Sequence, residues 1–310
     1  MNIVFFGTPD FAVSSLKKLV ASGEDIVSVV TQPDRVKGRG HKLSIPPVKE
    51  YALSQGIPVL QPVGIRSEEF LKTVAGMVPD LIVVVAYGRI IPPEILALPL
   101  QGCINVHASL LPKYRGAAPI QWSIVRGEPK TGVTTMLMDE GLDTGDIFLR
   151  AETDILPDDN AVSLGSRLSE MGADLLIATI RGIVQKTVRP VPQTGESTYA
   201  PIIRKEDGKI DWAASAQEIC SLTRGMYPWP GGQCMFKGEK ITIVKSRIAD
   251  TDARETAGSI VKIHGDELHV GTARGIIALL ELKPEGKQTM TGAAFARGRH
   301  ITEGMQFEYQ

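Results

Sequence analysis

Three polar side chains of different chemistry lie within five residues of one another in the stretch GCINVHASLLPKYRGAAP (102–119). If INVHAS is an extended strand, Asn105, His107 and Ser109 point to one side of it, and the intervening aliphatic residues point to the other. An amide can donate a hydrogen bond to a developing oxyanion, and an imidazole can relay a proton. We therefore predict a catalytic surface here, and we favour it over a histidine that serves only to fill a core.

A second polar cluster, MDEGLDTGDI (138–147), follows another apolar run. Four carboxylates around two glycines suit a metal-binding loop, but their spacing does not match an EF-hand, and Asx-rich turns form for backbone reasons. We therefore expect no metal. Asp143 is the candidate to orient the imidazole of His107 and to balance its charge. Ser109 lacks a GxSxG context, which argues against a serine hydrolase.

The elements that must position these side chains follow from the hydrophobic pattern. Up to residue 187, apolar runs of strand length alternate with helical stretches, which is typical of an α/β fold with a Rossmann-like, doubly wound, mostly parallel sheet. Ligands of such sheets bind at the carboxyl ends of the strands, where INVH ends. The predicted strands are 2–7, 25–30, 57–60, 80–86, 102–107 and 132–138, and a long helix is predicted over 160–186.

The pattern changes after the long helix. Residues 188–208 contain prolines and glycines without periodicity, which indicates a linker. From 209 to 310 a short helix precedes five short apolar runs separated by Gly-rich turns, which favours a smaller OB-like β-barrel domain. We therefore predict a catalytic domain over 1–187, a linker, and a second domain over 209–310. Trp212 and Trp229 are predicted to be packing residues.

The bulk composition narrows the class of protein. The chain has 310 residues, 43% hydrophobic content and a net charge of −1, which is typical of a globular protein. The longest apolar run, at 81–86, is far shorter than the roughly 20 residues of a membrane span, and no signal peptide is evident. We expect a cytoplasmic protein. Three cysteines without a CxxC pair predict neither a disulfide framework nor a zinc site.

One segment is strongly basic. RVKGRGHKLSIPPVK (35–49) contains Arg35, Lys37, Arg39 and Lys42 and no acidic residue. A glycine-rich cationic loop can follow a phosphate backbone, whereas an isolated charged run is usually only solvated. The position of this loop, after a strand and beside the polar segment, favours a ligand. Weaker candidates for contacts with phosphates lie in the second domain: Lys209, Arg224, Lys237, Lys240, Lys245 and Arg247.

Five motifs together carry a resemblance to a known family. In chain order they are GTPDFAV, TQPDRVKGRG, VVVAYGRIIP, GCINVHASLLPKYRGAAPIQW and MDEGLDTGDI, with KIDW and YPWPG in the second domain. They resemble the folate-dependent formyltransferases. The QPDRxxGRG pattern and the length of the second domain are most similar to the members of the family that act on charged initiator tRNA.

The resemblance implies transfer of a formyl group from 10-formyltetrahydrofolate to the α-amino group of initiator methionyl-tRNA. We expect a monomer that needs no metal. Asn105 and His107 would stabilise the oxyanion, and Asp143 would support His107. The tRNA would be bound by Arg35, Lys37, Arg39 and Lys42. The folate would be bound by Ser109, Leu110, Leu111, Pro112, Ala86, Tyr87, Ile90 and Leu142, with Tyr87 and the isoleucines as apolar walls.

Three alternatives remain open at this point. Another folate-dependent formyltransferase, or a formyltetrahydrofolate hydrolase, would share Asn105, His107 and Asp143 but would not need the basic loop. A nucleotide-binding regulatory module is suggested by FFGTPDF, although a full GxGxxG is missing. A non-catalytic RNA-binding protein would use the OB-like barrel alone.

Overall fold

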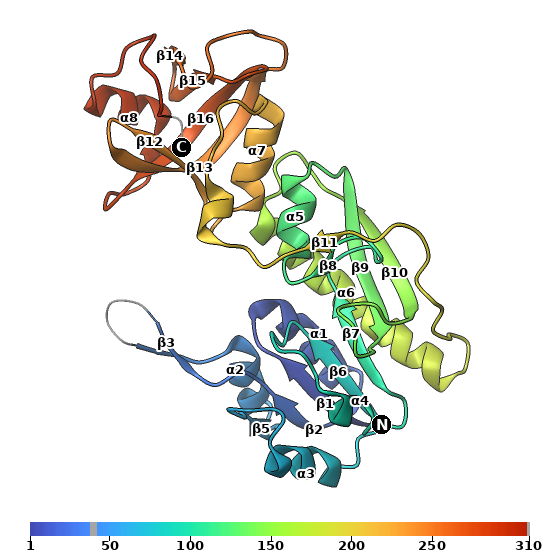
Figure 1. Cartoon of the computed structure of the whole chain (residues 1–310). Helices are drawn as coiled ribbons and strands as arrows, with labels where there is room; N and C mark the ends of the chain where they lie inside the picture. The colour runs from blue at the N-terminus through green and yellow to red at the C-terminus, as the bar shows by residue number, and fades with distance from the viewer. Residues whose placement is uncertain (38–41, 309–310) are drawn as a thin grey trace. The chain divides into compact units, whose positions relative to one another are not determined.

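The computed structural model describes residues 1–37 and 42–308, which form two compact units (Figure 1). The first unit comprises Met1–Pro119, Thr131–Thr153 and Gly165–Ala200, and the second comprises Ile120–Lys130, Asp154–Leu164 and Pro201–Gln310. The segment 188–200, predicted as linker, is therefore part of the first unit. Two short segments that precede Pro201, Ile120–Lys130 and Asp154–Leu164, also belong to the second unit.

A seven-stranded sheet with the order β10-β9-β7-β6-β1-β2-β5 forms the centre of the first unit. From β7 to β5 neighbouring strands are parallel, and β9 runs antiparallel to β7. The chain moves outward from β1 to β2 and β5 and then returns to β6 and β7 on the other side, which confirms the doubly wound, mostly parallel sheet. The strands are β1 (Asn2–Gly7), β2 (Asp25–Val30), β5 (Val59–Leu60), β6 (Leu81–Val85), β7 (Cys103–His107), β9 (Lys130–Leu137) and β10 (Ile147–Asp154).

Helices cover both faces of this sheet because its inner strands carry apolar side chains on both sides. Leu16 of α1 and Leu176 of α6 share one core cluster with Ile104 and Val106 of β7. Phe70 of α3 belongs to a separate cluster with residues of the opposite face. The helices are α1 (Asp10–Ala21), α2 (Pro47–Ser54), α3 (Glu68–Gly76), α4 (Pro93–Leu96), α5 (Pro119–Val125) and α6 (Ala161–Val184).

Two small strand pairs were not expected from the sequence. Within the basic segment, β3 (Arg35–Lys37) pairs antiparallel with β4 (Lys42–Ser44). In the first unit, β8 (Arg115–Gly116) pairs parallel with β11 (Tyr199–Ala200). The second pair, together with backbone hydrogen bonds between Val191 and Ile147, joins residues 188–200 of the predicted linker to the first unit.

The second unit contains an antiparallel sheet of order β12-β13-β16-β15-β14, with β17 paired to β16. Its core includes Trp212, Phe236, Phe295 and Phe307. Trp212 is fully buried as predicted, but Trp229 is 60% exposed, because it lies in the turn between α7 and β12. The elements are η1 (Lys205–Gly208), α7 (Ala216–Gly225), β12 (Gly232–Phe236), β13 (Glu239–Asp250), β14 (Ile260–His264), β15 (Glu267–Gly271), β16 (Ile276–Pro284), β17 (Met290–Thr291) and α8 (Gly292–Gly298).

No helix within the described part of the chain combines the length and the apolar composition that a membrane crossing requires.

Candidate active site

Strand β7 places Asn105 and His107 on the side of the sheet opposite Ile104 and Val106, which pack with α6. The alternation ends there. Ser109 lies beyond the strand in a bend, fully buried, and its Oγ donates a hydrogen bond to the carbonyl of Lys113 at 2.6 Å. The prediction of an extended chain through Ser109 is therefore wrong, because this hydrogen bond turns the chain back after His107.

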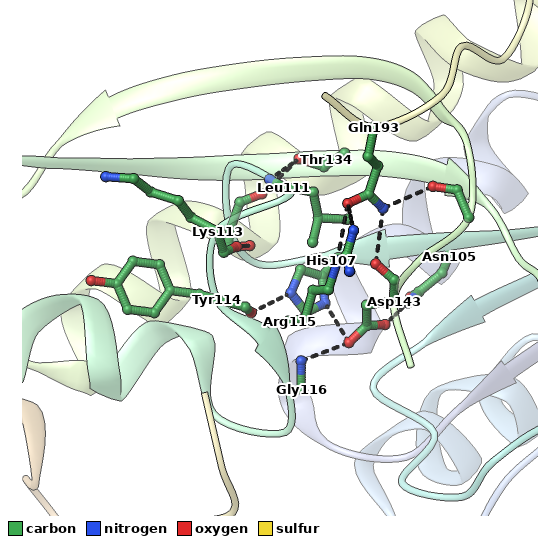
Figure 2. Close-up of polar contacts among 12 residues, drawn as sticks. Asn105, His107, Leu111, Lys113, Tyr114, Arg115, Gly116, Thr134, Asp143 and Gln193 are labelled. Atoms are coloured by element: carbon green, nitrogen blue, oxygen red, sulfur yellow. Dashed lines mark hydrogen bonds and ion pairs between the residues drawn. The ribbon is translucent and has the colours of Figure 1, made fainter. Parts of the chain in front are cut away.

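Asp143 brings the two polar segments together (Figure 2). Its Oδ2 lies 3.7 Å from Nδ1 of His107, and its Oδ1 accepts a hydrogen bond from Nδ2 of Asn105 at 3.3 Å. The backbone N–H of Gly116 donates to Oδ2 at 2.8 Å. A distance of 3.7 Å is an electrostatic contact rather than a hydrogen bond. The carboxylate is thus fixed between an amide, an imidazole and a backbone donor.

The other imidazole nitrogen is fixed by the backbone. Nε2 of His107 lies 2.9 Å from the carbonyl oxygen of Tyr114. A carbonyl only accepts, so this contact assigns a hydrogen to Nε2 and leaves Nδ1 on the side of Asp143. With 6% of the His107 side chain and 13% of the Asp143 side chain exposed, water screens their interaction weakly.

Asp139, another acid of the loop, has partners within the loop itself. Oδ1 of Asp139 accepts hydrogen bonds from the Gly141 N–H at 3.0 Å and from the Thr144 hydroxyl at 2.7 Å. This is an Asx-type turn, in which the carboxylate organises the backbone of its own loop. No group of three potential metal-binding side chains occurs among the residues that the structure describes.

The residues expected to bind folate divide into exposed and buried ones. Ile90 is 73% exposed and Leu142 is 55% exposed, and Ala86 is exposed with a left-handed φ of 45°. Leu111 is buried, whereas Leu110 and Pro112 are half-buried. The exposed aliphatic side chains are available to an apolar ligand.

Tyr87 differs from the expectation of an apolar wall. Its ring is 2% exposed and packs edge-on against Phe6, with a centroid distance of 5.2 Å. Burial raises the pKa of its phenol. The Tyr87 carbonyl accepts hydrogen bonds from Nε2 of Gln32 and Oγ1 of Thr8, both at 3.1 Å. The ring is core because the chain turns inward after the exposed Ala86.

Hydrogen bonds fix the chain immediately before the basic segment. Lys49 Nζ contacts the carboxylate of Asp34 at 2.7 Å and Oε1 of Gln61 at 2.6 Å, and the hydrogen bond from Lys49 lowers the pKa of Asp34. Arg35 is exposed, and Lys37 and Lys42 are register partners in the β3–β4 ladder. Arg39 lies outside the described residues.

A cavity of about 240 Å³ in the second unit gathers basic side chains. Lys209 and Lys240 are two of the six residues suggested by the sequence, and both line it. Arg224 and Arg247 are instead engaged within the fold, Arg224 with the Asp159 carbonyl and Arg247 with the carboxylate of Glu267. The complete lining is Lys205, Glu206, Lys209, Gln233, Met235 and Lys240.

Gln193 and Thr198 were not among the residues predicted from the sequence. The side-chain amide of Gln193 donates to the carbonyls of Asp143 and Gly145, and the Thr198 hydroxyl accepts from the N–H of Tyr114. Both lie in the aperiodic segment 188–208, where a residue's role depends on contacts distant in sequence.

Comparison with known proteins shows the family to which the chain belongs. The formyl transferase model matches residues 1–180, and the model of the formyl transferase C-terminal domain matches residues 202–300. The chain is 51% identical to a methionyl-tRNA formyltransferase of Thermodesulfovibrio yellowstonii over 98% of both chains. The chain belongs to the methionyl-tRNA formyltransferases, within the formyl transferase family.

Two further comparisons agree with this family. A methionyl-tRNA formyltransferase of Desulfotalea psychrophila is 48% identical over 97% of this chain and 94% of the relative. The crystal structure of WlaRD, a sugar 3N-formyl transferase, has a TM-score of 0.68 at 20% identity, over 93% of this chain and 99% of that chain. At that identity the likeness shows a shared formyltransferase fold. The two family models leave out residues 181–201, which include Gln193 and Thr198.

Proposed function

We propose that this formyltransferase transfers the formyl group of 10-formyltetrahydrofolate to the α-amino group of methionine on initiator methionyl-tRNA, at the start of translation. The observation that carries the proposal is the convergence of Asn105, His107 and Asp143 at the carboxyl end of β7, in a chain of this family. The amine of the acceptor is itself a nucleophile, so no covalent intermediate with the protein is needed.

Asn105 supplies the first catalytic contribution in this proposal. One N–H of its side-chain amide donates to Asp143, and the second can donate to the formyl oxygen as that oxygen becomes negative. The contact with Asp143 fixes the amide before the reaction, which makes such a donor effective. Removing one oxyanion donor costs about 3 kcal/mol of transition-state stabilisation.

His107 supplies the proton transfer. The amine forms a bond to the formyl carbon, and the bond from that carbon to the folate nitrogen breaks. We propose that His107 passes its Nε2 proton, which otherwise faces the Tyr114 carbonyl, to the leaving folate nitrogen, and that the proton lost by the attacking amine replaces it. The nearby carboxylate of Asp143 balances the positive charge that the imidazole carries during the transfer. General acid–base assistance of this kind contributes about 10²- to 10⁴-fold.

The folate supplies the formyl carbon, and exposed aliphatic side chains around the site suit the flat faces of its heterocycle, whose edge carries hydrogen-bond donors and acceptors. Ile90 and Leu142 expose aliphatic side chains in the segments after β6 and before Asp143, and a bound heterocycle would cover them. The buried Tyr87 ring would then support this surface from the core. The role of Ser109 would be to shape the bend through its bond to Lys113.

The tRNA is proposed to contact the basic segment through Arg35, Lys37, Arg39 and Lys42, and the second unit through the lysines of its cavity. In the second unit, Glu308 bridges to Met235 of β12 and Gln306 bridges to Ser259, just before β14. These bridges support our inference that the antiparallel sheet closes into an OB-like barrel. We expect a monomer to be active, as predicted from the sequence, and a role in translation would take place in the cytoplasm.

The test is an acceptor assay with purified protein and 10-formyltetrahydrofolate. Charged initiator tRNA, glycinamide ribonucleotide, an amino sugar nucleotide and water would be compared as acceptors, by following release of the folate product. We expect kcat/KM for the charged tRNA to exceed that for every other acceptor by at least about 10³-fold. A site built to pair with one acceptor leaves some of its own polar groups without hydrogen-bond partners when another acceptor binds. Preference for a sugar amine or for water would overturn the proposal.

A further inference from the structure

The backbone of Asp143 needs external support. Asp143 has a left-handed φ of 52°, which Asp adopts more readily than most residues with a Cβ but less readily than helical or extended backbone. Its two carboxylate oxygens point in fixed directions, toward Asn105 on one side and toward His107 and Gly116 on the other. A shift of this backbone would move both contacts together, so the groups that hold it determine the geometry of the site.

Gln193 holds this backbone through its side chain (Figure 2). Nε2 donates to the carbonyl of Asp143 and to the carbonyl of Gly145, both at 2.8 Å. Oε1 accepts from Nη2 of Arg115 at 2.7 Å and from Nε at 3.2 Å. The amide therefore uses both donors and both acceptor positions. Such complete pairing fixes the amide orientation, because a flipped amide would oppose two carbonyls with its oxygen.

Arg115 extends the network to the other side of the site. The residues on either side of it are Tyr114, whose carbonyl accepts from His107, and Gly116, whose N–H donates to Asp143. The bond between Arg115 and Gln193 thus closes a ring that runs from the Asp143 loop through the β8 segment and back to Asp143. Both segments that contact the imidazole are held by one glutamine.

The segment that carries Gln193 is anchored on both sides of it. Val191 and Ile147 exchange two backbone hydrogen bonds, at 2.8 and 2.9 Å. Thr198 accepts from the Tyr114 N–H through its side chain at 2.9 Å and from the Arg115 N–H through its carbonyl at 2.8 Å. Gln193 is therefore positioned by two pairings that belong to the catalytic unit itself.

We propose that Gln193, held by Arg115, is a positioning residue that sets the placement of Asp143 relative to His107. The proposal rests on the proposed function, whose chemistry it refines. It makes the segment 191–200 part of the active site, although this segment lies between the regions that the two family models match.

The central variant is Gln193→Met, which keeps the length of the side chain and removes its four hydrogen bonds. We expect kcat for formylation to fall about 10- to 100-fold, because small displacements of catalytic groups have effects of this size. KM for the folate and for the charged tRNA should each change by less than about threefold, since Gln193 contacts neither substrate in this arrangement. Gln193→Glu keeps a partner for Arg115 but places a carboxylate oxygen against the carbonyl oxygens of Asp143 and Gly145, so it should also lower kcat. This variant replaces Gln193→Met in the test if the methionine variant does not fold.

The matched control is Glu196→Gln, an exposed residue of the same segment, which should keep wild-type kcat. The decisive comparison is the Gln193→Met change in an Asp143→Asn background. If Gln193 acts through Asp143, adding Gln193→Met to the Asp143→Asn variant should lower the kcat of that variant by less than about threefold. Equal losses in both backgrounds, or a rise in KM alone, would overturn the inference. An inactive wild-type protein would refute the proposed function instead, so the two failures are distinct.

Discussion

At the scale of single residues, the hydrogen bonds around Asn105 constrain its catalytic role most clearly. Its amide is held by the carboxylate of Asp143, which in turn accepts from the Gly116 backbone and from Asn105 itself. This order of support means that Asn105 depends on Asp143 more than Asp143 depends on Asn105. Removing the amide should leave the rest of the site in place.

We therefore expect Asn105→Ala to lower kcat for formylation by about 10²- to 10³-fold, as the loss of one oxyanion donor does in other acyl-transfer sites. KM for the charged tRNA should stay within about threefold of the wild-type value, because the amide acts on the reacting oxygen. Steady-state kinetics with each substrate varied in turn would measure both.

A matched asparagine separates chemistry from stability. Asn160 accepts hydrogen bonds from the N–H groups of Val162 and Ser163 at the start of α6, so Asn160→Ala removes a helix cap. It should cost about 1 kcal/mol of folding free energy and leave kcat unchanged. An Asn105→Ala variant that loses only stability, and no more activity than Asn160→Ala, would contradict the catalytic role of Asn105.

At the scale of elements, the sequence predicted the strands that lie inside the sheet. β1 and β6 are nearly continuous apolar runs, since both of their faces are buried under helices, and β7 alternates between apolar residues and the polar Asn105 and His107. β10 was missed, because its residues alternate in burial along an edge strand and include several charges. The β3–β4 and β8–β11 pairs were missed because they involve only two or three residues per strand.

The site residues that could be predicted are likewise those that belong to a local sequence pattern. Asn105 and His107 follow from alternation on one strand, which is a local pattern. The contact of Asp143 was inferred from chemistry and from the resemblance. Gln193 and Thr198 act on groups about 50 and 84 residues away. No periodicity in the sequence records such pairings, because they depend on how the chain closes on itself.

The contacts of Asp34, which fix the start of the β3–β4 pair, lead to a prediction about binding of the charged tRNA. Lys49 and Gln61 hold Asp34 immediately before β3, so the hairpin leaves the sheet from a fixed point. We expect Arg39→Ala to raise KM for the charged tRNA and to reduce the salt dependence of kcat/KM by about one unit of slope, as for the loss of one phosphate contact. Asp34→Asn should raise KM for the tRNA in the same direction, because it releases the base of the hairpin.

The control for the hairpin is Lys18→Ala, which removes an exposed positive charge on α1 that pairs with Asp174. It should leave both the tRNA KM and the salt slope unchanged. Folate KM should stay constant in all three variants. If Arg39→Ala leaves the tRNA kinetics at the wild-type values, the assignment of this segment to the acceptor is wrong.

For the whole molecule, the net charge of −1 means that bulk charge does not attract a polyanion. Attraction must come from places where positive charge is concentrated. Two such places are on the chain: the basic segment of the first unit and the cavity of the second, which gathers Lys205, Lys209 and Lys240 around a single acid, Glu206. Most other basic residues suggested by the sequence are exposed singly or are paired.

We expect the double change Lys209→Ala with Lys240→Ala to raise KM for the charged tRNA, because two lysines at one cavity can neutralise neighbouring phosphates. The slope of log kcat/KM against log salt should become less steep by about one to two units. The proposed function assigns formyl transfer to residues of the first unit, so kcat at saturating tRNA should stay at the wild-type value. The control removes the same number of charges from the same unit, with Lys262→Ala and Lys283→Ala on β14 and β16, where the side chains are exposed and were not candidates for phosphate contacts. Should both double variants weaken tRNA use equally, the effect would come from net charge alone, and the cavity would have no particular part in binding the acceptor.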